Sequence, residues 1–225
     1  MSVNQSQQKK TVVPEPESLN TAAAHGAVSE RSSGTRTRKL VVVAMLSAVA
    51  FALAFLEFPV PLSPAFARYD FSDIPALIAA FALGPLAGVC VELVKNVLQL
   101  LSSATGGVGE LANFIIGAGM VLPAGLIYRK MKTKKGAILG CILGTVAMAV
   151  IAGLVNYFIL IPMFNIFMPI DEIIKSFGEF MPFIQTKLDV IIYNCVPFNL
   201  IKGALISLVT VLLYKRISPI LKGRR

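Results

Sequence analysis

Strongly polar side chains interrupt the long apolar stretches of this 225-residue chain. They are Glu57, Lys95, Asn96, Gln99, Asn113, Asn156, Asn194, Asn199 and Lys202. Asn199 and Lys202 are three residues apart and would share one face of a helix. An amide presents both a donor and an acceptor edge, which suits a neutral heteroaromatic or polyhydroxylated ligand. The set therefore indicates recognition of a ligand rather than reaction.

These groups also have a structural explanation. Asparagines in a membrane can simply hydrogen-bond between helices. Lys202 could form an ion pair with Glu92 or another carboxylate, and Lys95 has Glu92 and Gln99 as local partners on one helix face. The residues alone leave both interpretations open.

Catalysis and metal binding have little support. The only histidine, His25, lies in a polar N-terminal segment, so no histidine-based site is expected among the apolar runs. The three cysteines lack a paired spacing and are expected to be free, buried thiols. The glycines of "SSATGGVGE" (102–110) lack the Gly-Lys-Ser/Thr ending of a phosphate loop. We predict no enzymatic activity, no metal, no cofactor and no nucleic-acid partner.

The elements that carry the polar groups are membrane helices. The chain is 56% hydrophobic and only 15% charged, and all its apolar runs but one are near the roughly 20 residues that cross a lipid bilayer. The runs are 40–56, 74–91, 111–128, 136–170 and, with one lysine, 190–214. The run from 136 is longer than a crossing requires and is expected to end near Pro162.

Basic residues set the predicted topology. They cluster at 36–39, 129–135 and 215–225, and short basic loops stay in the cytoplasm. Placing all three clusters on one side requires an extra turn, which Gly84 and Pro85 can provide between helices at 72–83 and 86–101. The prediction is an all-α integral membrane protein with six transmembrane helices and both termini cytoplasmic. Its outer loops would be 57–73, 102–110 and about 162–189.

Three regions follow from this topology. Residues 1–38 are polar and without period, which predicts a disordered cytoplasmic tail. Residues 39–216 would form the six-helix substrate-binding domain, and 217–225 a basic cytoplasmic tail. A cleaved secretory signal is the competing interpretation of the N-terminus, but the 39-residue lead is too long for it.

Nearly all the polar groups then fall in the outer half of the membrane, which predicts one pocket open to the outside. The loop at 57–73 carries three prolines that would stiffen it. Asp70, Ser72 and Asp73 could cap the next helix, and capping is the preferred role for Asp73. Aromatic residues that could line the pocket are Phe55, Phe58, Phe66, Tyr69, Phe71, Tyr157, Phe158, Tyr193 and Phe198.

A stripe of small residues marks the first helix. Ala44, Ala48 and Ala52 recur every four residues and would let another helix pack closely. The partner could be a helix of the same bundle or a helix of another chain.

Three stretches resemble a known family. "YDFSDIPALIAAFALGPLAG" (69–88), "TGGVGELANFIIG" (105–117) and "PFNLIKG" (197–203) are similar to the riboflavin-binding S component of energy-coupling factor (ECF) vitamin transporters. The similarity covers roughly residues 40–215. It implies a six-helix subunit of the bacterial plasma membrane that captures riboflavin as a transport substrate.

The resemblance also implies partners and site residues. The subunit would work with a transmembrane coupling subunit (T component) and two cytoplasmic ATPases, and the coupling subunit would dock on Ala44, Ala48 and Ala52. Asn156, Asn199 and Lys202 would contact riboflavin. The loop containing Pro61, Phe66 and Asp70 would close over the vitamin as a lid. The remaining candidate binding residues are Glu57, Lys95, Asn96, Asn113, Phe58 and Tyr69.

Other functions stay open at this point. An S component for thiamin or biotin would have similar pocket chemistry. A secondary transporter working alone is a weaker alternative, because no internal inverted repeat is visible in the sequence.

Overall fold

The computed structural model describes residues 36–59, 68–103, 105–166 and 169–222. Val41–Arg225 forms one structural unit, separate from Met1–Leu40. The first described helix covers Arg36–Ala54 and so includes the last three residues of the expected tail. The predicted tail over 1–35 and the predicted lid residues Pro61 and Phe66 lie outside the described residues.

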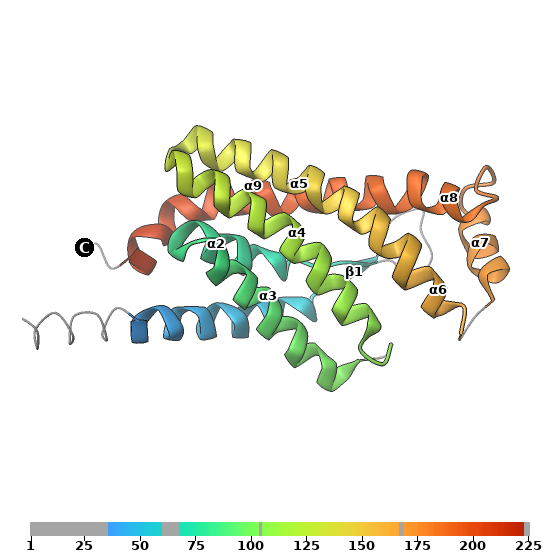
Figure 1. The fold of residues 1–225 in the computed structure, drawn as a ribbon, viewed down its shortest axis with the longest axis horizontal. Helices are drawn as coiled ribbons and strands as arrows, with labels where there is room; N and C mark the ends of the chain where they lie inside the picture. The colour runs from blue at the N-terminus through green and yellow to red at the C-terminus, as the bar shows by residue number, and fades with distance from the viewer. Residues whose placement is uncertain (1–35, 60–67, 104, 167–168, 223–225) are drawn as a thin grey trace, which may run out of the picture. The chain divides into compact units, whose positions relative to one another are not determined.

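Helices dominate the described chain, and only two short strands accompany them (Figure 1). The first part comprises β1 (Phe58–Pro59), β2 (Arg68–Tyr69), α2 (Asp73–Leu83), α3 (Pro85–Gln99), the 3₁₀ turn η1 (Leu100–Ser102) and α4 (Val108–Met131). The second comprises α5 (Lys134–Val155), the π-helix η2 (Asn156–Leu160), α6 (Ile161–Phe164), α7 (Ile170–Gly178), α8 (Lys187–Asp189), the π-helix η3 (Val190–Cys195) and α9 (Val196–Lys222).

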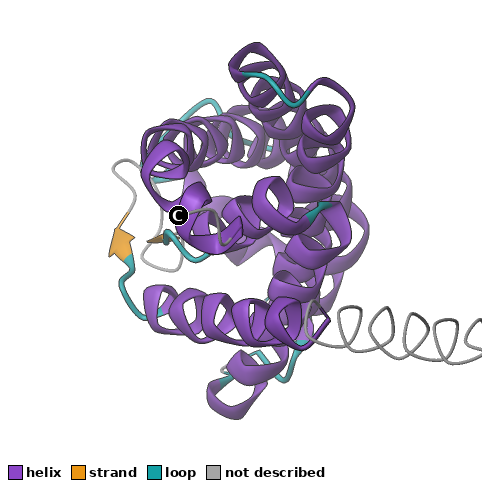
Figure 2. Ribbon diagram, turned by 90° about the vertical axis from the view of Figure 1, so that its left-hand side faces the viewer, coloured by secondary structure: helices purple, strands orange, loops and turns teal. Residues whose placement is uncertain are grey.

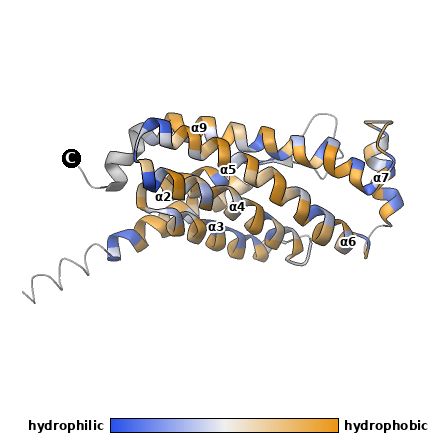
Figure 3. Ribbon diagram, turned by 45° about the horizontal axis from the view of Figure 1, so that its top comes forward, coloured by the Kyte–Doolittle hydropathy of each residue, from blue (hydrophilic) through white to orange (hydrophobic). Residues whose placement is uncertain are grey.

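Five described helices are long and apolar enough to cross a membrane, by length and composition. They are Arg36–Ala54, Pro85–Ser102, Val108–Met131, Lys134–Phe164 and Lys187–Tyr214. The sixth expected helix is α2, which is apolar but only 11 residues long. Large apolar side chains, such as Leu86 and Leu101, are exposed on these helices. Apolar residues extend along the helices, and polar residues gather near the helix ends (Figure 3). This distribution is that of a membrane protein.

The predicted break between two short helices is confirmed. Gly84 ends α2 with φ +112°, a backbone conformation that favours glycine, and Pro85 opens α3 at its first position. The backbone N–H of Gly84 donates to the carbonyl of Ala80, which satisfies one acceptor at the end of α2. The chain therefore reverses here without a loop of several residues.

Close packing of small residues holds the bundle together. In lipid, burial of apolar groups drives helix association weakly, so tight van der Waals contact must do so. A Cβ atom added to Gly140 would lie 2.7 Å from the carbonyl oxygen of Ala124, which places the backbones of α4 and α5 close together. Helices α4, α5 and α9 run side by side (Figure 1).

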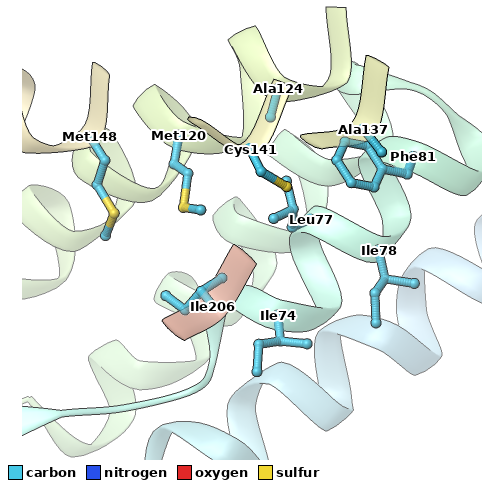
Figure 4. Packing of buried hydrophobic residues seen from close by; sticks show 10 residues of the cluster. All are labelled: Ile74, Leu77, Ile78, Phe81, Met120, Ala124, Ala137, Cys141, Met148 and Ile206. Carbon is cyan, nitrogen blue, oxygen red and sulfur yellow. The ribbon is translucent and has the colours of Figure 1, made fainter. Parts of the chain in front are cut away.

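The main apolar core joins four helices, α2, α4, α5 and α9 (Figure 4). It is formed by Ile74, Leu77, Ile78, Phe81, Met120, Ala124, Ala137, Cys141, Met148 and Ile206. At its edge the hydroxyls of Tyr128 and Tyr214 lie 2.9 Å apart, within hydrogen-bond distance. The core thus fixes α2 and α9, which supply Asp73 and Lys202 to the polar groups described below.

Two sequence expectations need correction. The long helix from Lys134 ends at Phe164, close to the expected end, but the following segment is not all loop, because Ile170–Gly178 forms the helix α7. The apolar face of α7 packs through Ile173 and Phe177 against Ile184 and Val190, which explains why the segment is helical. The cysteines are free as expected, but the thiol of Cys90 is exposed, since its side chain points away from the bundle core.

Two short antiparallel strands precede α2 (Figure 2). Phe58 pairs with Tyr69 in the ladder, and Pro59 pairs with Arg68. The ladder pairs the residues that follow the first helix with residues just before α2. Its second strand delivers Tyr69 and Asp70 directly to the start of α2.

Candidate functional site

A buried group of charged side chains lies where the β2–α2 connection meets α2, α3 and α9. We call it the lysine–carboxylate cluster. Its members are Asp70, Ser72, Asp73, Glu92, Lys95 and Lys202. The side chains of Asp73, Glu92 and Lys95 are 0% exposed. Such groups are costly inside a membrane protein and persist where they are paired or serve a ligand or transport path.

Lys95 is the centre of the cluster on α3. Its ammonium nitrogen lies 2.6 Å from Oδ1 of Asp73 and 2.7 Å from Oε2 of Glu92, and it donates a hydrogen bond of 3.0 Å to the hydroxyl of Ser72. The expected local partner Glu92 is therefore confirmed, and α2 supplies a second carboxylate. Lys95 donates hydrogen bonds to Asp73 and Ser72, and its contact with Glu92 is an ion pair.

Lys202 brings α9 into the same cluster. Its Nζ atom lies 2.9 Å from Oδ2 of Asp70 and 3.1 Å from Oδ2 of Asp73. The ion-pair interpretation of Lys202 is confirmed for this structure, but its partners are the two aspartates and not Glu92. The pair with Asp70 joins residues 132 positions apart in sequence, so it ties the β2–α2 connection to α9.

Asp73 does not act as the preferred helix cap. The residue before α2, Ser72, occupies the capping position, and no side chain there accepts from the helix backbone. Asp73 instead bridges Lys95 and Lys202, because its two carboxylate oxygens face different helices. Asp70 makes a local contact: it accepts hydrogen bonds from the backbone N–H and the hydroxyl of Ser72.

The cluster contains three carboxylates and two ammonium groups. Taking such charges out of water costs several kcal/mol each, and close opposite charges recover part of this. Gly117 on α4 makes room for one of the acids, because a Cβ atom there would lie 2.7 Å from Oε2 of Glu92. The packing of α3 on α4 is therefore fitted to the cluster.

The predicted amides bond mainly within the protein. Asn113 of α4 donates a 3.1 Å hydrogen bond to Oδ1 of Asn96 on α3, which confirms the interhelical role for this pair. Asn156 donates to the carbonyl of Ala152, and Asn199 donates to that of Cys195, each four residues earlier on its own helix.

Both of these asparagines adjoin π-helical turns. Asn156 opens η2, and Asn199 follows η3 by four residues. The π-helix η2 continues α5, and η3 leads into α9; the two π-helices contact each other. Short π-helical segments are frequent at functional sites because they redirect side chains within a helix.

An aromatic stack adjoins the cluster. The rings of Tyr69 and Phe198 are nearly parallel, at 3°, with centroids 4.5 Å apart. Phe198 lies one helical turn before Lys202, so the same face of α9 holds Tyr69 by stacking and Asp70 by charge. The last residue of β2, Tyr69, and the first residue of the β2–α2 connection, Asp70, are thereby attached to α9.

Several other predicted site residues lie on the surface of the protein. Glu57 and Phe58 are exposed, and Phe58 makes an edge contact with Phe71 at 5.8 Å between ring centroids. The predicted small-residue stripe is also exposed among the described residues: Ala44, Ala48 and Ala52 all point away from the core. The opposite face of this helix carries the buried Ser47 and Ala50.

Sequence reasoning missed Asp73 as a site residue. The aspartate lies at the start of a helix, where capping is the usual role of its type. The sequence did contain one indication of this role. Asp73 stands directly before an uninterrupted apolar run, and an acidic side chain in a membrane helix is tolerated where it is buried beside a cation. Which cation it would meet depends on the crossing of α2, α3 and α9, which the sequence does not specify.

Comparison with known proteins gives consistent results. The family described as "ECF transporter, substrate-specific component" matches residues 38–214. Riboflavin transporter RibU of Staphylococcus aureus (strain TCH60) is 38% identical over 187 residues, which cover 83% of this chain and 94% of that protein. Riboflavin transporter FmnP of Bacillus subtilis (strain 168) is 37% identical over 193 residues, which cover 84% of this chain and 97% of that protein.

A solved structure is also similar. It is described as "Structure and mechanism of the S component of a bacterial ECF transporter", with a TM-score of 0.65 and 38% sequence identity over 83% of this chain and 99% of that one. The matched region contains every residue of the lysine–carboxylate cluster. The chain is a membrane protein that belongs to the family of substrate-specific components of ECF transporters.

Proposed function

We propose that this chain captures riboflavin from outside the cell and serves as the substrate-binding component of an ATP-driven ECF transporter. The observation that carries the proposal is the match to riboflavin transporters over nearly their whole length, at 38% and 37% identity. The buried polar groups support it, because they offer donors, acceptors and a flat aromatic surface in one region. The chain itself would hydrolyse no ATP.

The proposed ligand contacts centre on α9. Asn199 and Lys202 are both only 6% exposed and lie on the same face of the helix. With Asn156 on η2 they could bond to the imide edge or the ribityl hydroxyls of riboflavin. The outer candidates are Glu57, Phe58 and Tyr69, and the deeper ones are Lys95, Asn96 and Asn113. Asp70, Pro61 and Phe66 belong to the proposed lid.

The proposed topology has six transmembrane helices with both termini in the cytoplasm. Helix α2 would be the sixth, a short crossing protected by α3, α4 and α9, which all pack against it. A short helix can cross when neighbouring helices shield its ends and backbone. The lysine–carboxylate cluster would then lie toward the outer side, and the Tyr128–Tyr214 pair toward the cytoplasm.

Riboflavin titration tests the substrate and the site together. Purified protein in mild detergent is expected to quench riboflavin fluorescence, with an affinity that falls by roughly 100-fold in Lys202→Met, since a charge-assisted hydrogen bond and its geometry are lost. Asn199→Ala should fall by roughly tenfold. Lys130→Met, which changes an exposed lysine of α4, is the control and should bind as the wild type does.

The titration can also contradict the proposal. If the wild-type protein binds thiamin or biotin but not riboflavin, the family assignment stands and riboflavin is excluded as the substrate. Equal affinities in the wild type and both site variants would remove these residues from the ligand site.

The exposed alanine stripe supports a docking surface for the transmembrane coupling subunit, which works with two cytoplasmic ATPases. Ala48→Leu is expected to leave riboflavin affinity in detergent unchanged but to reduce uptake by cells at least tenfold, because a large side chain separates closely packed helices. Val49→Leu, at the neighbouring exposed position, is the matched control. Uptake that persists without the partner subunits would instead indicate a transporter working alone.

A further inference from the structure

We propose that Asp73 is a positioning residue that fixes the ammonium group of Lys202 and so sets ligand affinity without touching the ligand. The inference rests on the proposed function, in which Lys202 contacts riboflavin. Its basis is the arrangement of the two carboxylates that meet this one lysine.

The two carboxylates differ in how firmly they are held. Asp70 lies in the connection between β2 and α2, and its side chain is 17% exposed. Asp73 lies within α2, and its side chain is 0% exposed. A displacement of the connection would therefore carry Asp70 with it and leave Asp73 in place.

Asp73 is itself fixed from the opposite side. Lys95 holds its Oδ1 atom at 2.6 Å, which leaves Oδ2 for Lys202 at 3.1 Å. Lys95 is in turn held by Glu92 at 2.7 Å and by Ser72 at 3.0 Å. The chain of contacts runs from α3 through α2 to α9, and its charged members Glu92, Lys95 and Asp73 all lie on helices of the bundle.

A lysine needs such support to act as a defined donor. Its ammonium group is a compact charge on a flexible four-carbon stem, which costs side-chain entropy to order. A carboxylate that holds the group before the ligand arrives reduces the ordering that binding requires. Asp73 can do this even where a ligand atom takes the place of Asp70 beside Lys202, because its ion pair with the nitrogen does not involve Asp70.

A set of variants separates positioning from simple stabilisation. Asp73→Asn is expected to weaken riboflavin binding by on the order of tenfold or more, since an amide no longer holds the ammonium group. In a Lys202→Met background the same change should weaken binding no further, because the two residues act through one contact. Thr145→Val is the control, since it removes a different buried polar contact of α9, the one between the hydroxyls of Thr145 and Ser207 at 3.3 Å, and leaves the lysine–carboxylate cluster in place.

Two binding results would overturn the inference. One is an equal loss of affinity in Asp73→Asn and Thr145→Val, which would indicate a general structural role. The other is a further loss when Asp73→Asn is added to Lys202→Met. If Asp73→Asn does not fold, Asp73→Glu replaces it, because this variant keeps the charge, shifts the carboxylate by one methylene and should still weaken binding in the wild-type background alone.

A readout without ligand distinguishes this inference from the proposed function. Reductive methylation of lysine, followed by peptide mass analysis, should label Lys202 several-fold faster in Asp73→Asn than in the wild type or in Thr145→Val, because a released amine is more accessible. Unchanged labelling of Lys202 would contradict its positioning by Asp73. Faster labelling in a protein that fails to bind riboflavin would contradict only the proposed substrate.

Discussion

Lys95→Met is expected to lower the free energy of unfolding by about 3 to 5 kcal/mol, the usual effect of removing one partner from a buried ion pair. The side chains of Asp73 and Glu92 are 0% exposed and both lie within 2.7 Å of the lysine nitrogen. Without Lys95, Glu92 loses its cation, and Asp73 keeps only Lys202. Methionine fills a similar volume, so the loss reports charge rather than a cavity.

A thiol-reactive dye can measure this loss as a shift in melting temperature. Cys141 and Cys195 are buried and become reactive on unfolding, while the exposed Cys90 is first replaced by serine in all proteins compared. The expected shift is on the order of 10 °C downward. Adding Glu92→Gln to Lys95→Met should restore part of it, because one uncompensated charge is removed.

Lys135→Met, at an exposed position on α5, serves as the control and should melt with the wild type. A Lys95→Met protein that also melts with the wild type would show that the two acids do not depend on this lysine. The cluster would then have to be held by other groups.

The second large effect is expected at Gly88, where α3 meets α2 and α4. A Cβ atom added there would lie 2.4 Å from Cγ1 of Val121, 2.6 Å from the carbonyl oxygen of Ala76 and 2.8 Å from Cβ of Ala80. The helices must separate to accept it, and overpacking of this kind costs about 1 to 3 kcal/mol or somewhat more. Gly88→Ala should therefore lower the melting temperature by several degrees.

Gly153→Ala is the matched comparison. The nearest atoms to its added Cβ are at 3.5 and 3.6 Å, which is ordinary van der Waals contact. Alanine also favours the helix over glycine by up to about 1 kcal/mol, so this variant should be neutral or slightly stabilised. Equal melting of the two variants would contradict the close packing of α3 against α2 and α4.

Much of the fold was predictable because the bilayer limits what a chain can do. Long uncharged runs identify spanning helices, and a glycine followed by proline at 84–85 marks the end of one helix and the start of the next. The structure confirms that break. The helix α7 was missed because the segment 162–189 is rich in charged residues and was interpreted as an outer loop. The apolar residues of α7 are nevertheless spaced as in an amphipathic surface helix.

The site was predictable in its residue types but not in its pairings. The polarity of Lys95 and Lys202 within apolar runs identified both as buried. The partners of Lys202 were not evident, since Asp70 and Asp73 lie more than 120 residues away in sequence. Such long-range ion pairs depend on how helices cross, which hydrophobic pattern alone does not determine. The role of Asp73 as a bridge therefore came only from the structure.

The central claim, that this ECF substrate-specific component binds riboflavin, is tested most directly by the visible absorption spectrum of the purified protein. The protein is taken in mild detergent from cells supplied with riboflavin, and the released ligand is identified by its mass. The account predicts a flavin spectrum with about one flavin per chain, as expected for a single enclosed site. A colourless protein that also fails to quench the fluorescence of added riboflavin would contradict it.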